Sequence, residues 1–144
     1  MSTRSVRIFP LTGLLMLAIS PLTALPAQAA VSAAAASNAQ CWATHYGPQP
    51  AGALTASGEV FDNNADTAAT SLSLQPQLPF GTHVLVTNVA NGESLTVRIN
   101  DRGTFTSTPQ SPKCLDLSDG AFSRLGGVLD PDAGHIVVIE QVLG

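Results

Sequence analysis

Two alternating segments joined by a short turn constrain the fold of this chain more than any other feature of its sequence. In residues 83–88 and 94–100 every second residue is apolar, a period typical of strands with one buried face: Val84, Val86, Leu95, Val97 and Ile99. Between the two segments lies Asn91-Gly92, a dipeptide favoured in type I′ turns because both of its positions take positive φ. The sequence therefore predicts a β-hairpin here.

Further short strands are expected on both sides of this hairpin. Residues 41–46 alternate, which places Trp42, Thr44 and Tyr46 on one face. Residues 135–143 are rich in β-branched residues, which favour strands.

A short helix is expected late in the chain, after another strand over residues 115–117. Ser118 is a favourable N-cap, and Gly126-Gly127 is a typical stop. Many short strands with one small helix, and no regular alternation of strand and helix, predict an all-β fold in a closed or nearly closed barrel.

The first 29 residues have the pattern of a secretory signal peptide. Arg4 and Arg7 precede the apolar run Leu11–Ile19, and Ala27–Ala29 offers a small-residue cleavage site. This run is shorter than the about 20 residues that a membrane-spanning helix needs. The residues before Cys41 do not look like a lipobox, so we expect no membrane anchor. We expect cleavage near Ala29 and a secreted or periplasmic protein that meets the cell wall.

Residues 30–40 are rich in alanine and lack periodicity, which predicts a disordered tether. Residues 41–144 are then a single domain. The chain has two cysteines, Cys41 and Cys114. In an oxidising compartment they are expected to form one disulfide. A catalytic cysteine is the alternative, but no Cys-His spacing supports it.

The charge balance argues against a nucleic-acid partner. Without the leader, four basic residues face ten acidic ones, and an acidic protein is repelled by phosphates. His83 and His135 lack the spacing of metal ligands. We therefore expect neither a metal nor a cofactor.

Four carboxylates are expected where turns meet strands: Glu59, Asp62, Asp101 and Asp116. Carboxylates at strand ends can line a groove across a barrel mouth, as acid catalysis on a sugar chain requires. In the structural alternative, Asp62 and Asp101 bond nearby amides in Asx-turns and Asp116 faces a helix dipole. The spacing alone leaves both interpretations open.

Several segments resemble the rare lipoprotein A (RlpA) family, and they occur in the order typical of that family: TASGEVFDNNADTAA, LPFGTHVLVTN, NGESLTVRINDRGTF and CLDLSDGAF. The resemblance covers the chain from about Ala43 to its end. It implies a six-stranded double-psi β-barrel with one or two short helices, related to the expansin catalytic domain.

The resemblance also implies an activity, an endolytic lytic transglycosylase acting on the glycan strands of peptidoglycan. Its partners would be these strands, together with septal or wall proteins, and we expect a monomer. The family motifs place catalytic carboxylates at Glu59, Asp62 and Asp101, and Asp116 matches an acidic position of the expansins. Thr70 stands where members have a histidine, and residues 71–77 are an apparent insertion.

The mechanism expected from this resemblance uses Asp101 as the acid that protonates the bridging oxygen. Arg102 and Arg98 flank Asp101, so either could pair with it or bind a substrate carboxylate. Trp42 and Tyr46 are candidates for stacking on sugar rings or for the core. Four phenylalanines are expected in the barrel interior: Phe61, Phe80, Phe105 and Phe122.

Two other classes of function stay open. One is a non-catalytic, expansin-like module that binds polysaccharide without cleaving it. The other is a secreted inhibitor or interaction protein that uses a surface loop such as residues 104–113.

Overall fold

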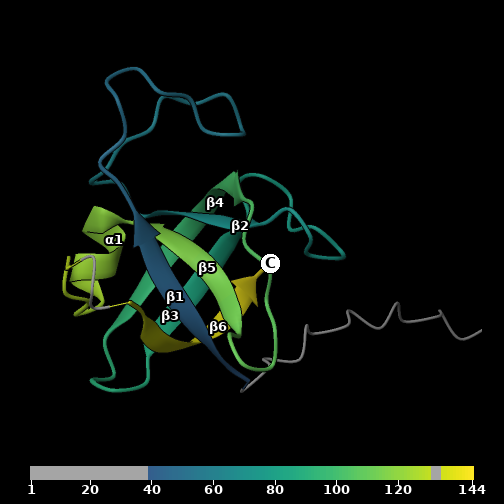
Figure 1. Cartoon of the computed structure of the whole chain (residues 1–144), viewed down its shortest axis with the longest axis vertical. Coiled ribbons are helices and arrows are strands. Elements are labelled where there is room, and N and C mark those ends of the chain that lie inside the picture. The colour runs from purple at the N-terminus through teal and green to yellow at the C-terminus, as the bar shows by residue number, and fades with distance from the viewer. Residues whose placement is uncertain (1–38, 131–133) are drawn as a thin grey trace, which may run out of the picture. The chain divides into compact units, whose positions relative to one another are not determined.

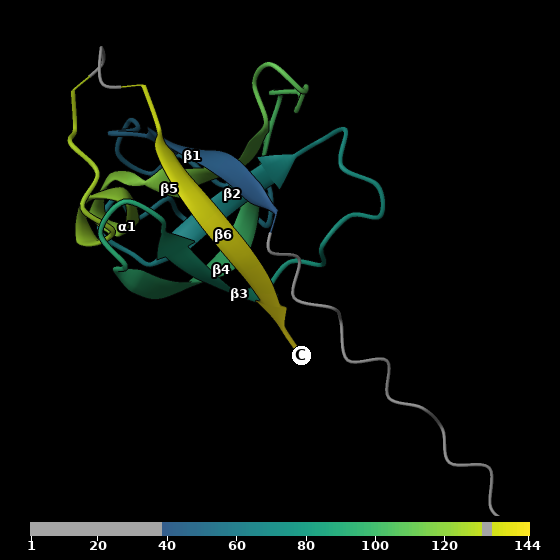
Figure 2. The same ribbon diagram turned by 90° about the horizontal axis from the view of Figure 1, so that it is seen from below.

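The computed structural model describes residues 39–130 and 134–144, and these residues form a closed barrel with strand order β1-β5-β2-β4-β3-β6 (Figure 1). Within the described residues there are six strands and one helix: β1 (Gln40–Tyr46), β2 (Thr67–Ser71), β3 (His83–Asn88), β4 (Ser94–Gly103), β5 (Lys113–Ser118), α1 (Asp119–Arg124) and β6 (Ile136–Leu143). Figure 2 shows β6 in front, where it pairs with both β1 and β3 and closes the barrel. The predicted all-β barrel is confirmed.

Two of the six strand pairings are parallel. They join β1 to β5 and β2 to β4, whereas the other neighbours are antiparallel. A mixed, closed sheet of this kind is consistent with the double-psi barrel that the family resemblance implied.

The β3–β4 hairpin forms as predicted, but its turn does not. Gly92 has a φ of 76°, whereas no described residue other than glycine has positive φ, so Asn91-Gly92 is not a type I′ pair. The connection runs over residues 89–93. Asn88 and Asn91 both donate their side-chain amides to the Leu125 carbonyl, at 2.7 and 3.2 Å. These tertiary contacts favour a longer turn that reaches the end of α1.

The sequence did not predict β2, which is the strand between β4 and β5. All five of its residues are buried. Because neighbouring structure covers both faces, the segment shows no alternation of polar and apolar residues, which is the signal used for the other strands.

The core consists of small and branched side chains that point into the barrel: Ala43, Ala68, Val84, Val86, Val97, Ile99, Leu115, Leu117 and Val138. One end is filled by Phe122 and Leu125, which lie in and just after α1. The α1 helix begins as predicted, since Ser118 Oγ accepts the Ala121 N–H at 3.1 Å. Figure 1 shows α1 beside β1 and β5, both of which it contacts.

The predicted disulfide is present. Cys41 of β1 is bonded to Cys114 of β5, with Cα atoms 5.8 Å apart. Both residues pack against the core at the end of the barrel opposite α1, because they lie at the start of two parallel strands that α1 follows.

The predicted signal peptide and most of the predicted tether lie outside the described residues. Across residues 39–130 and 134–144, no helix has the length and apolar character needed to span a membrane.

Candidate functional site

Three neighbouring strands bring Asp101 and Asp116 to one face of the sheet. Ala69 of β2 pairs with Asp101 of β4 on one side and with Asp116 of β5 on the other. Asp116 pairs in turn with Thr44 of β1. Paired residues point to the same side of a sheet. Ala68 belongs to the core, so its neighbour Ala69 points outward and the two carboxylates lie on the outer face.

A β-bulge places Asp101 within β4. Ala68 and Ala69 pair with Ile99 and Asp101, so Asn100 is an extra residue in β4. The strand continues to Gly103. Asp101 was expected where a turn meets a strand; it lies within β4, two residues before the end of the strand and on its outer face.

Three donors hold the Asp101 carboxylate. Oδ1 accepts the backbone N–H groups of Ala56 and Arg102, each at 2.8 Å, and Oδ2 accepts the Tyr46 hydroxyl at 3.0 Å. Two of these donors are backbone amides, as in the structural alternative, but neither forms the predicted Asx-turn, because Arg102 is the next residue and Ala56 is 45 residues away. Asp101 is nevertheless only half-buried, so its carboxylate is fixed without being sealed from solvent.

Tyr46 connects the two carboxylates electrostatically. Burial raises the pKa of its hydroxyl well above the usual value, and the charges of Asp101 and Asp116 raise it further. The hydroxyl therefore stays protonated and remains a hydrogen-bond donor. Its ring lies against Phe61, with centroids 5.0 Å apart.

Asp116 has two partners that the sequence did not single out. Thr44 donates its hydroxyl to Oδ1 at 2.5 Å, and the Lys113 ammonium lies 3.0 Å from Oδ2. The sequence contained a weak indication of both contacts: Thr44 was predicted on the same strand face as Tyr46, and Lys113 precedes Asp116 by only three residues. We call Thr44, Tyr46, Asp101 and Asp116 the acidic face.

Glu59 is paired with Arg98, and this pair settles which arginine contacts which carboxylate. Both terminal nitrogens of Arg98 donate to Glu59, at 2.7 and 2.8 Å, and Asn100 Nδ2 adds a contact of 3.3 Å. The hydrogen bonds from Arg98 lower the pKa of the Glu59 carboxyl to about 2. Arg98 therefore pairs with Glu59 and not with Asp101.

The loop between β1 and β2, which carries Glu59, also contacts Asp101 and Asn100 of β4. Its backbone donates from Ala56 to Asp101 and from Ser57 to the Asn100 carbonyl, and Asn100 in turn contacts Glu59. Asp62 lies in the same loop, exposed, and accepts the Asn64 N–H at 2.9 Å, as the Asx-turn alternative predicted. In the described part of the chain, no hydrogen bond joins Asp62 to Asp101.

Arg102 holds the inserted segment and does not pair with the Asp101 carboxylate. Its guanidinium donates to Thr70 Oγ1 at 3.1 Å and to the Leu78 carbonyl at 2.5 Å, and it lies 4.1 Å over the Phe80 ring. Thr70 is 1% exposed. Thr70 was predicted to contact a sugar, but almost none of its surface is exposed for such a contact.

Aromatic rings lie outside the barrel, contrary to expectation for three phenylalanines. Phe61 packs on Tyr46, Phe80 lies under Arg102, and Phe105 lies 4.2 Å from the Lys113 ammonium. Phe122 alone of the four is in the core. The interior of so narrow a barrel is filled by Val, Ile, Leu and Ala, which leaves the larger rings at the surface. Trp42 also lies outside the core and stacks on His135, with centroids 3.8 Å apart.

The fold and the site together define a class. This is a double-psi β-barrel with a carboxylate pair and a tyrosine on the outer face of its strands. The chain belongs to the lytic transglycolase family, whose model matches residues 34–139.

Curated relatives carry names that state an activity. The chain is 50% identical to the probable endolytic peptidoglycan transglycosylase RlpA of Synechocystis. The match extends over 84 residues, which are 58% of this chain and 23% of that protein. It is 40% identical over 101 residues to the endolytic peptidoglycan transglycosylase RlpA of Neisseria meningitidis serogroup A, covering 70% of this chain and 38% of that protein. The chain thus spans less than two fifths of the length of either relative.

Among solved structures, the chain is similar to the Streptomyces papain inhibitor, at 23% identity and a TM-score of 0.46. The match covers 72% of this chain and 94% of that chain. A likeness of this size bears on neither function nor mechanism.

Proposed function

We propose that this protein is an endolytic lytic transglycosylase that cleaves peptidoglycan glycan strands at its acidic face. The observation that carries the proposal is the placement of Asp101 and Asp116 on either side of Ala69, with the Tyr46 hydroxyl bonded to Asp101. Membership of the lytic transglycolase family and the printed activity of the curated relatives support it.

In the proposed reaction, Asp101 acts as acid and then as base. Its carboxylic acid gives a proton to the oxygen that bridges MurNAc and GlcNAc, and the bond from C1 to that oxygen breaks as the sugar flattens toward an oxocarbenium ion. The C6 hydroxyl oxygen then bonds to C1, and its proton passes to the Asp101 carboxylate. The products are a 1,6-anhydro end and a new GlcNAc hydroxyl, so no water is consumed.

The other polar groups bind and orient the substrate. Glu59 stays ionised through its pairing with Arg98, so it suits contacts to sugar hydroxyls and not proton donation. Asp116 and the exposed Asp62 offer acceptors for hydroxyls on either side. Tyr46 holds Asp101 in one orientation through its hydroxyl.

Half-buried aromatic rings near the acidic face fit a sugar polymer as substrate. Phe61 and Phe105 lie beside residues of the acidic face or their partners, and Trp42 lies on the same strand as Thr44 and Tyr46. Aromatic faces stack on the apolar faces of sugar rings. In the proposed complex, these rings would contact the glycan strand on both sides of the scissile bond.

If the substrate is peptidoglycan, the protein acts at the cell wall. We infer export directed by residues 1–29, cleavage near Ala29 and action in the periplasm or outside the cell, as a monomer that septal or wall proteins can recruit.

The test is digestion of purified peptidoglycan by the exported protein, with mass spectrometry of the products. The protein is expected to release fragments with 1,6-anhydro-MurNAc ends, and Asp101→Asn is expected to lower their yield at least a hundredfold because the proton donor is lost. The thermal midpoint of Asp101→Asn should change little, since the amide keeps the shape and most contacts.

The matched control is Glu93→Gln, in the exposed hairpin connection and outside the acidic face, which should digest like the wild type. Anhydro ends from Asp101→Asn at the wild-type yield would contradict the proposed mechanism.

A second function is favoured by one observation. Three donors occupy both oxygens of the Asp101 carboxylate and hold it in one orientation, as a group that binds sugar hydroxyls without transferring a proton would be held. The protein would then be an expansin-like module that binds glycan without cleaving it. Retention on peptidoglycan without any new chain ends would establish this alternative.

A further inference from the structure

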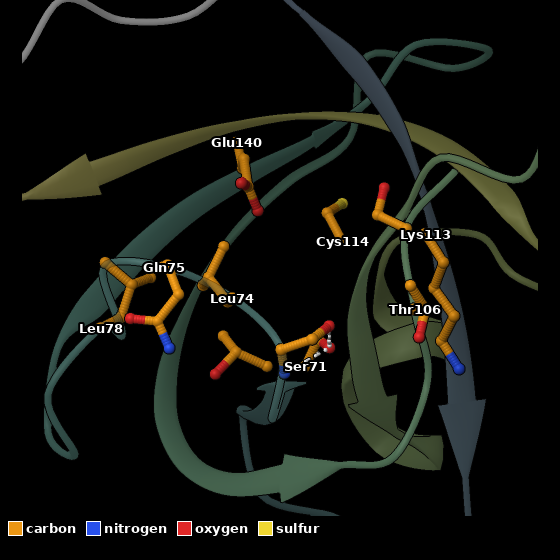
Figure 3. Close-up of a pocket in the computed structure, with 11 residues that line it drawn as sticks. Ser71, Leu74, Gln75, Leu78, Thr106, Lys113, Cys114 and Glu140 are labelled. Atoms are coloured by element: carbon orange, nitrogen blue, oxygen red, sulfur yellow. Dashed lines mark hydrogen bonds between the residues drawn. The ribbon is translucent and has the colours of Figure 1, made fainter. Parts of the chain in front are cut away.

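A pocket of about 420 Å³ lies near the end of the barrel opposite α1, where β2, β5 and β6 meet two loops (Figure 3). Eleven residues line it, among them Ser71, Leu74, Leu78, Lys113, Cys114 and Glu140. None of the four predicted carboxylates is among them. The volume falls within the range of pockets that hold small organic ligands.

Glu140 supplies the charge of this pocket. It pairs with Val86 across β6 and β3, and Val86 is a core residue, so Glu140 points to the interior side of the barrel. Figure 3 shows its carboxylate directed toward the pocket, across from Leu74. Burial raises the pKa of this carboxyl. Among the described residues, no hydrogen bond or ion pair involves its side chain.

The basic residue nearest this pocket does not neutralise Glu140. Lys113 lines the pocket, but its ammonium lies 3.0 Å from Asp116 and 4.2 Å from the Phe105 ring. In Figure 3 its nitrogen points away from Glu140. The Glu140 carboxylate is thus left without a cation, an arrangement that costs free energy unless a ligand supplies one.

A metal ion does not fit as that cation. Glu140 Oε lies within 4.8 Å of the sulfurs of Cys41 and Cys114. Both sulfurs belong to the disulfide, however, and a metal binds thiolates. The single carboxylate and neutral sulfurs instead suit an organic cation.

The wall formed by the inserted segment is held in place before any ligand binds. Gln77 Nε2 donates to the carbonyls of Ser71 and Leu72, at 2.7 and 3.1 Å. Arg102 donates to the Leu78 carbonyl. These bonds fix Leu74 and Leu78 as an apolar wall, so little ordering cost remains for binding.

We propose that this pocket binds a small aliphatic primary amine, whose ammonium group pairs with Glu140 while its carbon chain lies against Leu74, Leu78 and the disulfide. The amine comes either from a free diamine or from a lysine-type side chain of a peptide, since both present the same groups. The proposal does not depend on the transglycosylase function, because none of the four predicted carboxylates lines the pocket.

The test is titration of the 15N-labelled exported protein at pH 7 with cadaverine, with Nα-acetyl-lysine N-methylamide and with 1-pentanol, followed by NMR. One or both amines should shift the amides of residues 71–75, 77–78, 113–114 and 140 in a saturable way. Cadaverine alone would identify a free amine as the ligand, and the lysine derivative alone or with cadaverine would identify a side chain. The alcohol should bind at least tenfold more weakly than the amine.

The decisive variant is Glu140→Gln, expected to lower amine affinity at least tenfold while the protein stays folded, as its spectrum will show. Glu93→Gln is the matched control and should bind like the wild type. The proposal is overturned if neither amine gives saturable shifts at these amides, if 1-pentanol binds as tightly as the amines, or if Glu140→Gln keeps the wild-type affinity.

Discussion

Tyr46 shows how one hydroxyl can organise a site that carries two negative charges. It donates to Asp101 and its pKa is raised in part by Asp116, so it is a donor held between two acids. We expect Tyr46→Phe to lower the rate of glycan cleavage roughly ten- to a hundredfold, because a hydrogen bond to a charged group contributes about 1.5–3 kcal/mol. Counting anhydro ends over time measures this rate.

The thermal midpoint separates this effect from loss of the fold, because Phe keeps the ring that packs on Phe61. An unchanged rate in a folded Tyr46→Phe would show that Asp101 needs no donor.

The Glu59–Arg98 pair predicts a pH dependence of stability. The pKa of Glu59 falls from 4.5 to about 2 on folding, so the pair stabilises the fold above about pH 4.5 and this contribution is lost as the pH drops toward 2. Glu59→Gln should therefore be less stable than the wild type at pH 7 and equally stable near pH 2. Urea unfolding at both pH values measures the difference. An equal gap at both pH values would contradict the ion-pair assignment.

Among the elements, the hairpin connection depends on one glycine. Gly92 has a φ of 76° and has open space around the position of a Cβ, so Gly92→Ala changes backbone preference without a steric clash. We expect a loss of roughly 1–2 kcal/mol in the free energy of unfolding. Val89→Ala, an exposed change in the same connection, is the control and should cost less. Equal losses would show that the turn tolerates other conformations.

Elements with local signals were predictable, and those made by tertiary contacts were not. The hairpin strands and the Ser118 cap depend on alternation and on a local hydrogen bond, which the sequence displays. Strand β2 is buried on both faces and carries no such pattern. The bulge at Asn100 sets the direction of the Asp101 side chain. It depends on the pairing of β4 with β2, so the sequence did not predict it either.

The candidate site was predictable in its residue types but not in its partners. Asp101 and Tyr46 were expected from their motif and strand face, and they are in contact. The partners of the carboxylates depend on which strands become neighbours. Glu59 pairs with Arg98 of β4, and Asp116 is bonded by Thr44 of β1 and by Lys113. That information comes from the closed barrel as a whole.

On the scale of the molecule, the disulfide closes a long stretch of chain. Cys41 and Cys114 are 73 residues apart, and the chain-entropy model assigns such a loop about 4 kcal/mol. Replacing both cysteines by serine should lower the thermal midpoint by roughly 15–30 °C for a domain of this size. A reducing agent should do the same to the wild type and nothing to the variant, as calorimetry can show. An unchanged midpoint would mean that the core alone holds the barrel.

The strand order has a further consequence for the chemistry of the two acids. Because β2 lies between β4 and β5, the backbones that carry Asp101 and Asp116 are two inter-strand steps apart, roughly 9–10 Å. Double displacement through a glycosyl-enzyme ester needs carboxyl groups only about 5 Å apart. Asp101 and Asp116 reach that separation only if both side chains lean toward each other across Ala69, so the strand order favours a single acid over a covalent intermediate.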